Sequence, residues 1–261
     1  MPHSTLHLHD VTVCYGQRPA VHHVGFDLPC GALAALIGPN GSGKSSLLKA
    51  VLGWLPLSSG SIGIDGRPVS ESANRIAYLP QRENVDLDFP ITVADVVAQG
   101  RYRALGWARG FDADDHRRVE QALVELGLDR LRDRPLAQLS GGQQQRTFLA
   151  RALATGADIF LLDEPLSALD TPARHDLLAR LRRWATEAHR LVIVVTHHLD
   201  EIAPYFTHAV LINTHLIAAG PVAEVLVPSH LRTCFGATPG LLRPVPDLGP
   251  ILRHGHSPVE R

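Results

Sequence analysis

Residues 38–46 read Gly38-Pro39-Asn40-Gly41-Ser42-Gly43-Lys44-Ser45-Ser46. The run fills the pattern G-x-x-x-x-G-K-[ST] directly after residues 32–37, an apolar stretch that predicts a short buried strand. Its glycines allow backbone N–H groups to approach nucleotide phosphates, and the helix predicted over residues 44–52 directs its positive N-terminus at them. We expect Lys44 to reach the β- and γ-phosphates and the Ser45 hydroxyl to bind Mg²⁺. The alternative is a glycine-rich turn that fits the pattern by chance.

A second acidic site follows the apolar run Ile159-Phe160-Leu161-Leu162, which predicts another buried strand. Two carboxylates, Asp163 and Glu164, stand at its end. Ligands of open α/β sheets bind at the carboxyl ends of the strands, so both side chains are expected near the phosphates. Asp163 suits a contact to Mg²⁺ through water, and Glu164 is placed to act as the general base on an attacking water. Taken alone, the pair could equally form a solvated turn.

The rest of the chain alternates short apolar runs with helical patterns. Strands are predicted at residues 6–13, where apolar and polar residues alternate, and at 61–66, 75–79 and 191–196. Residues 86–155 have a helical pattern, and an amphipathic helix is predicted over 172–189. This order predicts an α/β fold with a largely parallel sheet, interrupted by a helical subdomain. We expect one domain over residues 1–228 and a flexible tail, rich in proline and glycine, over 229–261.

Composition narrows the class of protein. The 261 residues are 45% hydrophobic and 20% charged, with a net charge of −1, so the chain has no basic field for nucleic acid. Cys14, Cys30 and Cys234 are scattered, which favours reduced thiols over disulfides or a zinc site. The N-terminus does not have the features of a signal peptide, and no apolar run approaches the ~20 residues that span a bilayer.

A third motif narrows the class of phosphate-binding protein. Residues 139–146 read Leu139-Ser140-Gly141-Gly142-Gln143-Gln144-Gln145-Arg146. Ser140 can cap a helix, and Gly141 and Gly142 leave backbone amides accessible to an anion. A plain helix start would account for the serine but not for the double glycine and the glutamines. The run resembles the signature sequence of ABC transporter ATP-binding subunits.

Four further positions of this sequence match residues of that family. Tyr15 resembles the aromatic residue that stacks on adenine, although it could also pack within a strand. Gln81 resembles the glutamine that senses Mg²⁺ and the γ-phosphate, and would otherwise be an exposed loop amide. Asp170 resembles the residue of a loop that crosses to the partner subunit, or it caps the next helix. His197 resembles the histidine that contacts the γ-phosphate, while His198 stands where the family more often has aspartate.

The resemblance covers residues 6–228 and implies a P-loop NTPase (RecA-like) core with an antiparallel β edge and an inserted helical subdomain. It also implies a homodimer, in which ATP and Mg²⁺ held by residues 38–46 of one chain are covered by Ser140 to Gln143 of the other. Hydrolysis would then drive a separate membrane permease. The chain would lie on the cytoplasmic face of the cell membrane as a peripheral subunit.

The segment after Gln81 indicates a subfamily. Residues 88–93 read Asp-Phe-Pro-Ile-Thr-Val and residues 100–102 read Gly-Arg-Tyr, which resembles the ATPases of manganese, zinc and iron importers. This resemblance implies import of a divalent metal cation, with an extracytoplasmic metal-binding protein as a further partner. The alternatives are an ATPase of a siderophore or haem importer, a soluble ABC ATPase not tied to transport, and a non-catalytic regulatory binder. Only one motif set and no coiled-coil insertion are present, which disfavours the soluble enzymes.

The fifteen histidines raise the question of a structural metal site. Residues 7 and 9, 22 and 23, and 254 and 256 form histidine pairs, and paired imidazoles can bind Zn²⁺. No carboxylate or cysteine completes any pair at ligand spacing, so we expect solvated surface histidines and no structural metal.

Overall fold

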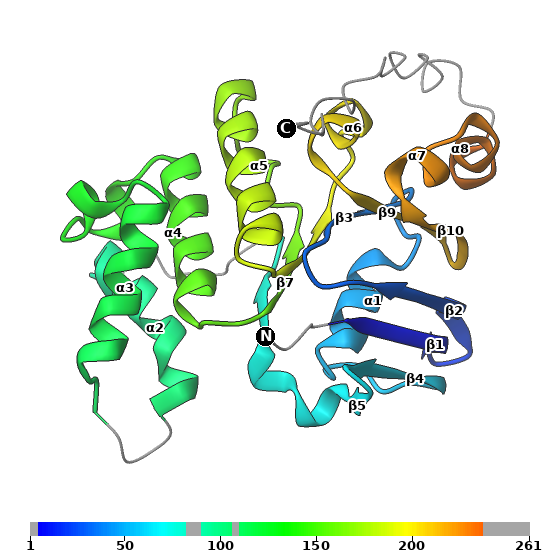
Figure 1. Cartoon of the computed structure of the whole chain (residues 1–261), viewed down its shortest axis with the longest axis horizontal. Helices are drawn as coiled ribbons and strands as arrows, with labels where there is room; N and C mark the ends of the chain where they lie inside the picture. Colours follow the sequence, from blue (N-terminus) through cyan, green and yellow to red (C-terminus); the bar gives the residue numbers. More distant parts are fainter. Residues whose placement is uncertain (1–4, 82–89, 106–109, 237–261) are drawn as a thin grey trace, which may run out of the picture.

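A computed structural model of the chain describes residues 5–81, 90–105 and 110–236, which form two sheets flanked by helices (Figure 1). The larger sheet has the strand order β10-β9-β3-β8-β7-β6. Its strands run parallel except β10, which pairs antiparallel with β9 at one edge. The largely parallel sheet predicted from the sequence is therefore confirmed. The strands are β3 (Leu33–Ile37), β6 (Ile76–Leu79), β7 (Ile159–Asp163), β8 (Leu191–Val195), β9 (His208–Asn213) and β10 (His215–Pro221).

The smaller sheet is antiparallel, with the order β2-β1-β4-β5. Its first strand has the predicted alternation, because Leu6 and Leu8 are buried while His7 and His9 face outward. The first helix, α1, shares an apolar core with this sheet and with one face of the larger sheet. The elements are β1 (Leu6–Tyr15), β2 (Arg18–Leu28), β4 (Ser59–Ile64), β5 (Arg67–Pro68) and α1 (Lys44–Val51).

Three helices follow one another between β6 and β7 and lie together at the left of Figure 1: α2 (Val93–Leu105), α3 (Ala113–Glu125) and α4 (Gly141–Ala154). A buried ion pair links α2 to α3, with 2.8 Å between Arg101 Nε and Asp115 Oδ1. The same guanidinium donates to the carbonyls of Ala154 and Thr155 at the end of α4. One buried arginine thus ties the three helices together, and its own charge is paired.

The remaining helices are α5 (Thr171–Thr186), α6 (Ile202–Tyr205), α7 (Val222–Val225) and α8 (Pro228–Phe235). Short 3₁₀ turns lie at Val69–Glu71, Ala73–Arg75, Asp129–Leu131, Leu136–Gln138 and Leu199–Glu201. Within the described ranges, no helix combines the length and apolar character needed to cross a bilayer.

Two apolar cores explain why the central strands read as continuous apolar runs. Successive side chains of a strand point to opposite faces of the sheet. In β7, Phe160 and Leu162 pack into the core that includes α2 to α5, whereas Ile159 and Leu161 pack into the core that includes α1 and the smaller sheet. Because both faces are covered, no position of β3, β7 or β8 reaches solvent.

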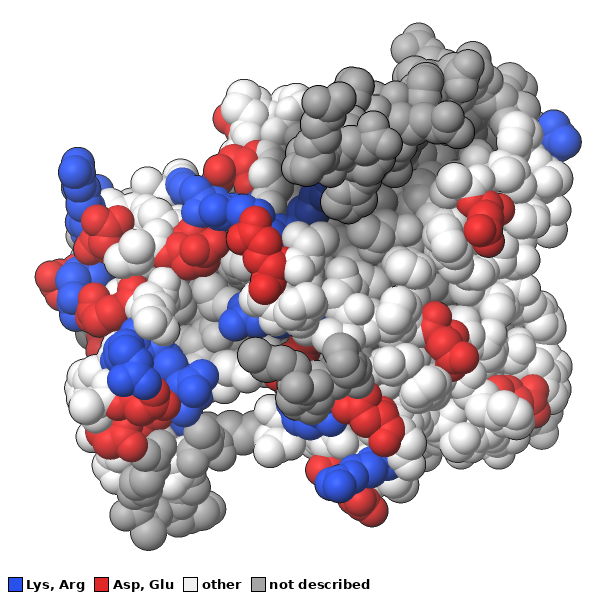
Figure 2. Space-filling view, viewed as in Figure 1, with Lys and Arg blue, Asp and Glu red and all other residues white. Residues whose placement is uncertain are grey.

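The two sides of the molecule also differ in surface charge. In the view of Figure 2, lysine, arginine and acidic side chains gather over the helical side at the left, and the side of the smaller sheet carries few charged groups. The tail predicted from residue 229 is wrong in its first part, because α8 occupies Pro228–Phe235. A proline in the first turn and the burial of Cys234 beside β9 stabilise this helix. Residues 237–261 lie outside the described residues.

Candidate functional site

The phosphate loop, residues 38–46, joins the carboxyl end of β3 to the start of α1. Two of its glycines are required by close packing. A Cβ atom on Gly38 would lie 2.1 Å from the carbonyl oxygen of Ile212, and one on Gly43 would lie 2.2 Å from that of Ala20. Gly43 also has a φ of 96°, a conformation that side chains disfavour. The loop therefore has the shape that the sequence pattern predicts, with its N–H groups at the start of a helix.

A cavity of about 510 Å³ opens over this loop. Tyr15 lines it from the end of β1 and is 54% exposed, so it is not part of the apolar core. Gln81 and Glu164 also line the cavity, together with the loop itself. The full lining is Tyr15, Ala20, Asn40, Gly41, Ser42, Gly43, Lys44, Ser45, Ser46, Gln81 and Glu164.

Lys44 is 7% exposed and donates from Nζ to the carbonyl oxygens of Gly38 and Pro39, at 2.9 Å each. Burial lowers the pKa of Lys44, and the carboxylates of Glu164 and Asp163 oppose this shift. In the described part of the chain, the buried Ser42 hydroxyl has no hydrogen-bond partner. A buried cation and an unsatisfied hydroxyl in one loop favour an anionic ligand at this position.

Asp163 ends strand β7 and is 3% exposed. Burial raises the pKa of this carboxyl group, while a hydrogen bond from Ser45 and the nearby Lys44 charge act against the shift. The structure thus brings together Ser45 and Asp163, the first-turn hydroxyl and the strand-end carboxylate that the sequence predicts as metal ligands. Oxygen ligands of this kind fit Mg²⁺.

Glu164 is held between two other predicted site residues. Its Oε2 accepts a hydrogen bond from Gln81 Nε2 at 2.7 Å, and its Oε1 accepts one from His197 Nε2 at 2.9 Å. Its backbone has a φ of 54°, which is uncommon for a residue with a side chain. The three side chains come from the ends of β6, β7 and β8, which are neighbours in the parallel sheet. Gln81 is therefore more than an exposed loop amide.

The predicted signature residues lie elsewhere. Ser140 caps α4: its hydroxyl accepts from the N–H of Gln143 at 3.3 Å, and the Gln143 side chain accepts from the N–H of Ser140 at 3.0 Å. Neither they nor Gly141 and Gly142 line the phosphate-loop cavity. Asp170 is exposed and caps α5 by accepting from the N–H of Ala173 at 2.9 Å. One chain therefore does not bring these residues to its own phosphate loop.

The chain is similar to known proteins over most of its length. The family described as ABC transporter matches residues 21–167, more than half of the chain. The chain belongs to the ABC transporter family. It is 41% identical over 227 residues to the zinc transport system ATP-binding protein TroB of Treponema pallidum, covering 87% of this chain and 85% of that protein. It is 39% identical over 229 residues to the manganese transport system ATP-binding protein MntB of Bacillus subtilis, covering 88% and 91%. An ABC transporter in an inward-facing conformation superimposes with a TM-score of 0.79 at 28% identity, covering 89% of each chain.

Membership of this family makes the chain an ATPase with a nucleotide as its ligand, and confirms the P-loop NTPase fold predicted from the sequence. The ABC transporter ATPase also contains contacts that the sequence did not reveal. The carbonyl oxygen of Ala20 lies against Gly43. Arg174, at the start of α5, forms an ion pair at 3.1 Å with the buried Glu201, four residues after His197. Both contacts join segments far apart in sequence, so no local pattern could have indicated them.

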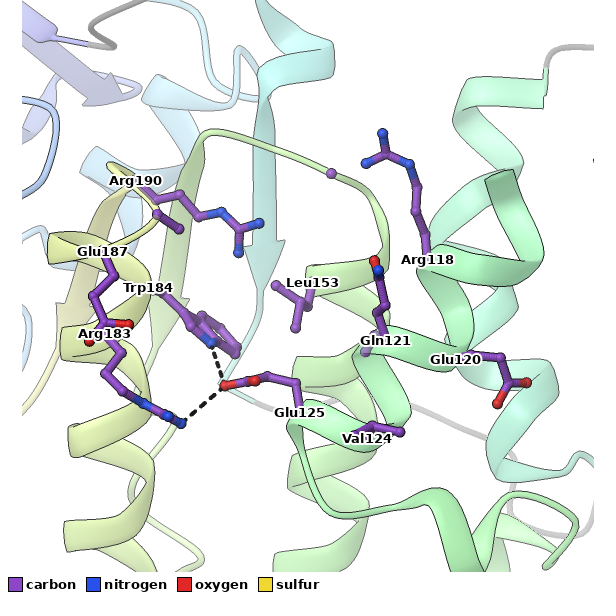
Figure 3. Close-up of a pocket in the computed structure, with 13 residues that line it drawn as sticks. Arg118, Glu120, Gln121, Val124, Glu125, Leu153, Arg183, Trp184, Glu187 and Arg190 are labelled. Carbon is purple, nitrogen blue, oxygen red and sulfur yellow. Dashed lines mark hydrogen bonds and ion pairs between the residues drawn. The ribbon is translucent and has the colours of Figure 1, made fainter. Parts of the chain in front are cut away.

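A second cavity of this ATPase, about 700 Å³, lies between α3, the end of α4 and the end of α5 (Figure 3). One acidic side chain of its wall is held by two neighbours: Glu125 Oε1 accepts from Trp184 Nε1 at 3.1 Å and from Arg183 Nη2 at 3.3 Å. None of the predicted site residues lines it.

In the described ranges, no three His, Cys, Asp or Glu side chains gather where they could hold a metal ion. His7 pairs instead with Asp27, at 2.8 Å.

Proposed function

We propose that this ABC ATPase energises the import of a divalent metal cation, Mn²⁺, Zn²⁺ or Fe²⁺, through a separate membrane permease. The proposed cargo is supported by the similarity to relatives named as zinc and manganese transport ATP-binding proteins, at 39–41% identity over 87–88% of the chain. The observation that carries the chemistry is the meeting of Gln81, Glu164 and His197 beside the phosphate loop.

ATP is proposed to bind with its phosphates in the loop of residues 38–46 and its adenine against Tyr15. The exposed tyrosine ring lines the same cavity as the loop and offers a stacking face. Lys44 would exchange its bonds to the Gly38 and Pro39 carbonyls for phosphate oxygens, which makes it a charge-assisted donor in a buried setting. The unsatisfied Ser42 hydroxyl supports the same assignment.

Ser45, Asp163 and Gln81 are the residues proposed to hold Mg²⁺. The buried Asp163 has a raised pKa because of desolvation, so a cation at its oxygens would relieve an unfavourable charge. When bound, the metal ion neutralises charge that develops on the β- and γ-phosphates.

Glu164 is proposed to act as the general base. Water attacks the γ-phosphorus, Glu164 takes a proton from the water, and the bond to the bridging oxygen of ADP breaks. Gln81 and His197 each contact one oxygen of this carboxylate, so they fix its direction and leave its remaining lone pairs for water. His197 would then contact the γ-phosphate, with His198 a half-buried neighbour.

The closed site is proposed to need two copies of the chain. Ser140 to Gln143 begin a helix on the surface, where the N–H groups of Gly141 and Gly142 can meet the ATP of a second copy. Asp170 is exposed on the same chain and would face the partner there.

The permease is proposed to dock through helices α2 to α4, within the helical subdomain predicted over residues 86–155. A groove of about 920 Å³ lies beside the edge strand β6 and α2, and Trp54, Tyr78, Gly100 and Arg101 help to line it. Trp54 in this groove is 63% exposed and Tyr102 on α2 is 57% exposed, and large exposed aromatic side chains suit a partner helix. Docking would place the ATPase on the cytoplasmic face of the membrane, opposite a metal-binding protein. Asp88 and Phe89, the first two residues of the subfamily resemblance, lie outside the described residues.

The test is transport by the reconstituted complex. The ATPase and its permease in lipid vesicles should accumulate radioactive Mn²⁺ or Zn²⁺ only when ATP is present on the ATPase side. Glu164→Gln should abolish accumulation, lower the hydrolysis rate by about 10²–10⁴-fold, retain ATP binding and trap a closed dimer. Uptake of a haem or siderophore complex without uptake of the free cation would contradict the cargo. Retained turnover by Glu164→Gln would remove this residue from the role of base.

A further inference from the structure

The phosphate loop rests on the turn between β9 and β10. The carbonyl oxygen of Ile212, near the end of β9, lies so close to Gly38 that any side chain there would overlap it. The N–H of Thr214 donates to the carbonyl of Ser42 at 3.0 Å, and the carbonyl of Thr214 accepts from the N–H of His22 at 2.7 Å. Thr214 has a φ of 60°, so the turn has a sharply defined shape. The position of the loop therefore depends on the position of this turn.

The turn between β9 and β10 is held by helix α8. Asn213 donates from Nδ2 to the carbonyl oxygen of Cys234 at 3.1 Å. The thiol of Cys234 is 1% exposed and lies 3.7 Å from the carbonyl oxygen of Ile212, the same oxygen that contacts Gly38. Burial raises the pKa of Cys234 to about 11, so the thiol stays protonated and can donate weakly to that oxygen. A continuous path of contacts thus leads from α8 through residues 212–214 to the phosphate loop.

We propose that helix α8 is a positioning element of the nucleotide site, and that Asn213 is the positioning residue that connects the two. The inference rests on the proposed nucleotide site and adds to it a support from the last described helix of the chain. The hydrogen bond from Asn213 fixes the turn against α8, and the turn fixes the separation between the Gly38 and Ser42 parts of the loop. Binding of phosphates and docking of α8 are then linked, and each stabilises the other.

The first test separates nucleotide affinity from turnover. Asn213→Ala removes the donor to Cys234, and we expect the Kd and KM for ATP to rise about fivefold while kcat at saturating ATP stays within about twofold. Asn213→Asp has nearly the same size but cannot donate, so the same rise is expected. Thr233→Ala is the matched control, because it removes an exposed bond within the same helix, from Thr233 Oγ1 to the Ser229 carbonyl, and should leave Kd unchanged.

The second test uses the unmodified chain and so does not depend on the folding of a variant. Saturating MgADP should slow hydrogen exchange at the amides of residues 232–236 by at least about threefold. In Lys44→Ala this protection should be lost. An unchanged Kd in Asn213→Ala and Asn213→Asp, or unchanged exchange in α8, overturns the inference. If Lys44→Ala binds nucleotide as tightly as the unmodified chain, the proposed nucleotide site itself is wrong, and the two failures are thereby distinguished.

Discussion

Two helices of this ATPase begin at predicted phosphate-binding motifs, and they differ in whether a side chain caps the backbone N–H groups of the first turn. Helix α1 starts after Gly43, which provides no side-chain cap, and its first residue, Lys44, is buried. Helix α4 starts after Ser140, which forms a complete capping box with Gln143 on the exposed surface. Free N–H groups at a helix start must find a partner. The start of α1 is therefore built around a ligand, whereas the start of α4 is stable before any partner arrives.

This difference shows how the work is divided between two copies. One chain holds the phosphate loop, Gln81 and the proposed base Glu164 around one cavity, and His197 contacts Glu164. The residues proposed to cover the nucleotide lie outside that cavity, and their helix is already capped. A lone chain should bind ATP without hydrolysing it rapidly, because only contact between two chains brings both helix starts to one nucleotide.

Mixing two inactive variants gives the largest expected effect. Lys44→Ala and Ser140→Arg should each lower the hydrolysis rate by about 100-fold or more, the first by removing a phosphate ligand and the second by blocking the partner's site. In a mixed dimer one site combines both defects and the other combines neither. The mixture should therefore regain about a quarter of the normal rate, measured as phosphate release.

The control for this mixture is Lys44→Ala combined with the double variant that carries Lys44→Ala and Ser140→Arg. Every site then has a defective phosphate loop, and the rate should stay low. A mixture of the single variants that regains no activity would mean that each chain completes its own site, and the comparison between α1 and α4 would be wrong.

Nucleotide binding by the single chain should separate the same two helix starts. Lys44→Ala should weaken ATP binding about 10- to 100-fold, since it deletes a charge-assisted donor in a buried position. Ser140→Arg should leave binding unchanged at protein concentrations where the chain is monomeric. Isothermal titration calorimetry measures both. Equal losses in the two variants would show that α4 contributes to the cavity of its own chain.

Tyr15 tests the adenine end of the cavity. Removing its ring in Tyr15→Ala should raise the Kd for ATP about fivefold, in line with about 1 kcal/mol for an aromatic contact. Tyr15→Phe keeps the ring and should bind ATP as the unmodified chain does. The Kd for inorganic triphosphate, which has no base, should be the same in all three proteins. A shared loss for triphosphate would move Tyr15 from the adenine to the phosphates.

Asp163 gives the smallest expected effect, on stability. Burial raises its pKa in the folded chain, so its ionised form destabilises the metal-free fold at any pH above the unfolded value of 3.8. Asp163→Asn should therefore raise the Tm by roughly 2–4 °C at pH 7 without metal, and the gain should vanish as the pH falls below 3.8. Asp176→Asn, which removes only an exposed ion pair with Arg180 on α5, is the control and should not raise the Tm. A lower Tm for Asp163→Asn would contradict the assigned cause.

Much of this architecture could be predicted, because its determinants are local. The apolar run before Gly38 and the one before Asp163 become parallel strands of one sheet, with only β8 between them, and their carboxyl ends bring the loop and the two carboxylates to the same edge. The support beneath the loop could not be predicted. It joins Gly38 to Ile212 and Asn213 to α8, and the loss of periodicity after Pro228 predicts a tail where residues 229–235 form a helix. Asp170 could be interpreted in two ways, and its helix cap is compatible with either.

The hydrogen bonds around Glu164 affect how much ATP the cell spends without transport. Both oxygens of the proposed base are already engaged, one by Gln81 and one by His197. Each oxygen keeps a further lone pair, so water can still meet this carboxylate, but only from the directions that the two contacts leave open. Gln81 precedes α2, one of the helices proposed to dock the permease, so docking would shift this glutamine and with it the direction of the Glu164 carboxylate. A Glu164 carboxylate that is correctly directed only in the docked subunit would limit ATP hydrolysis between transport cycles.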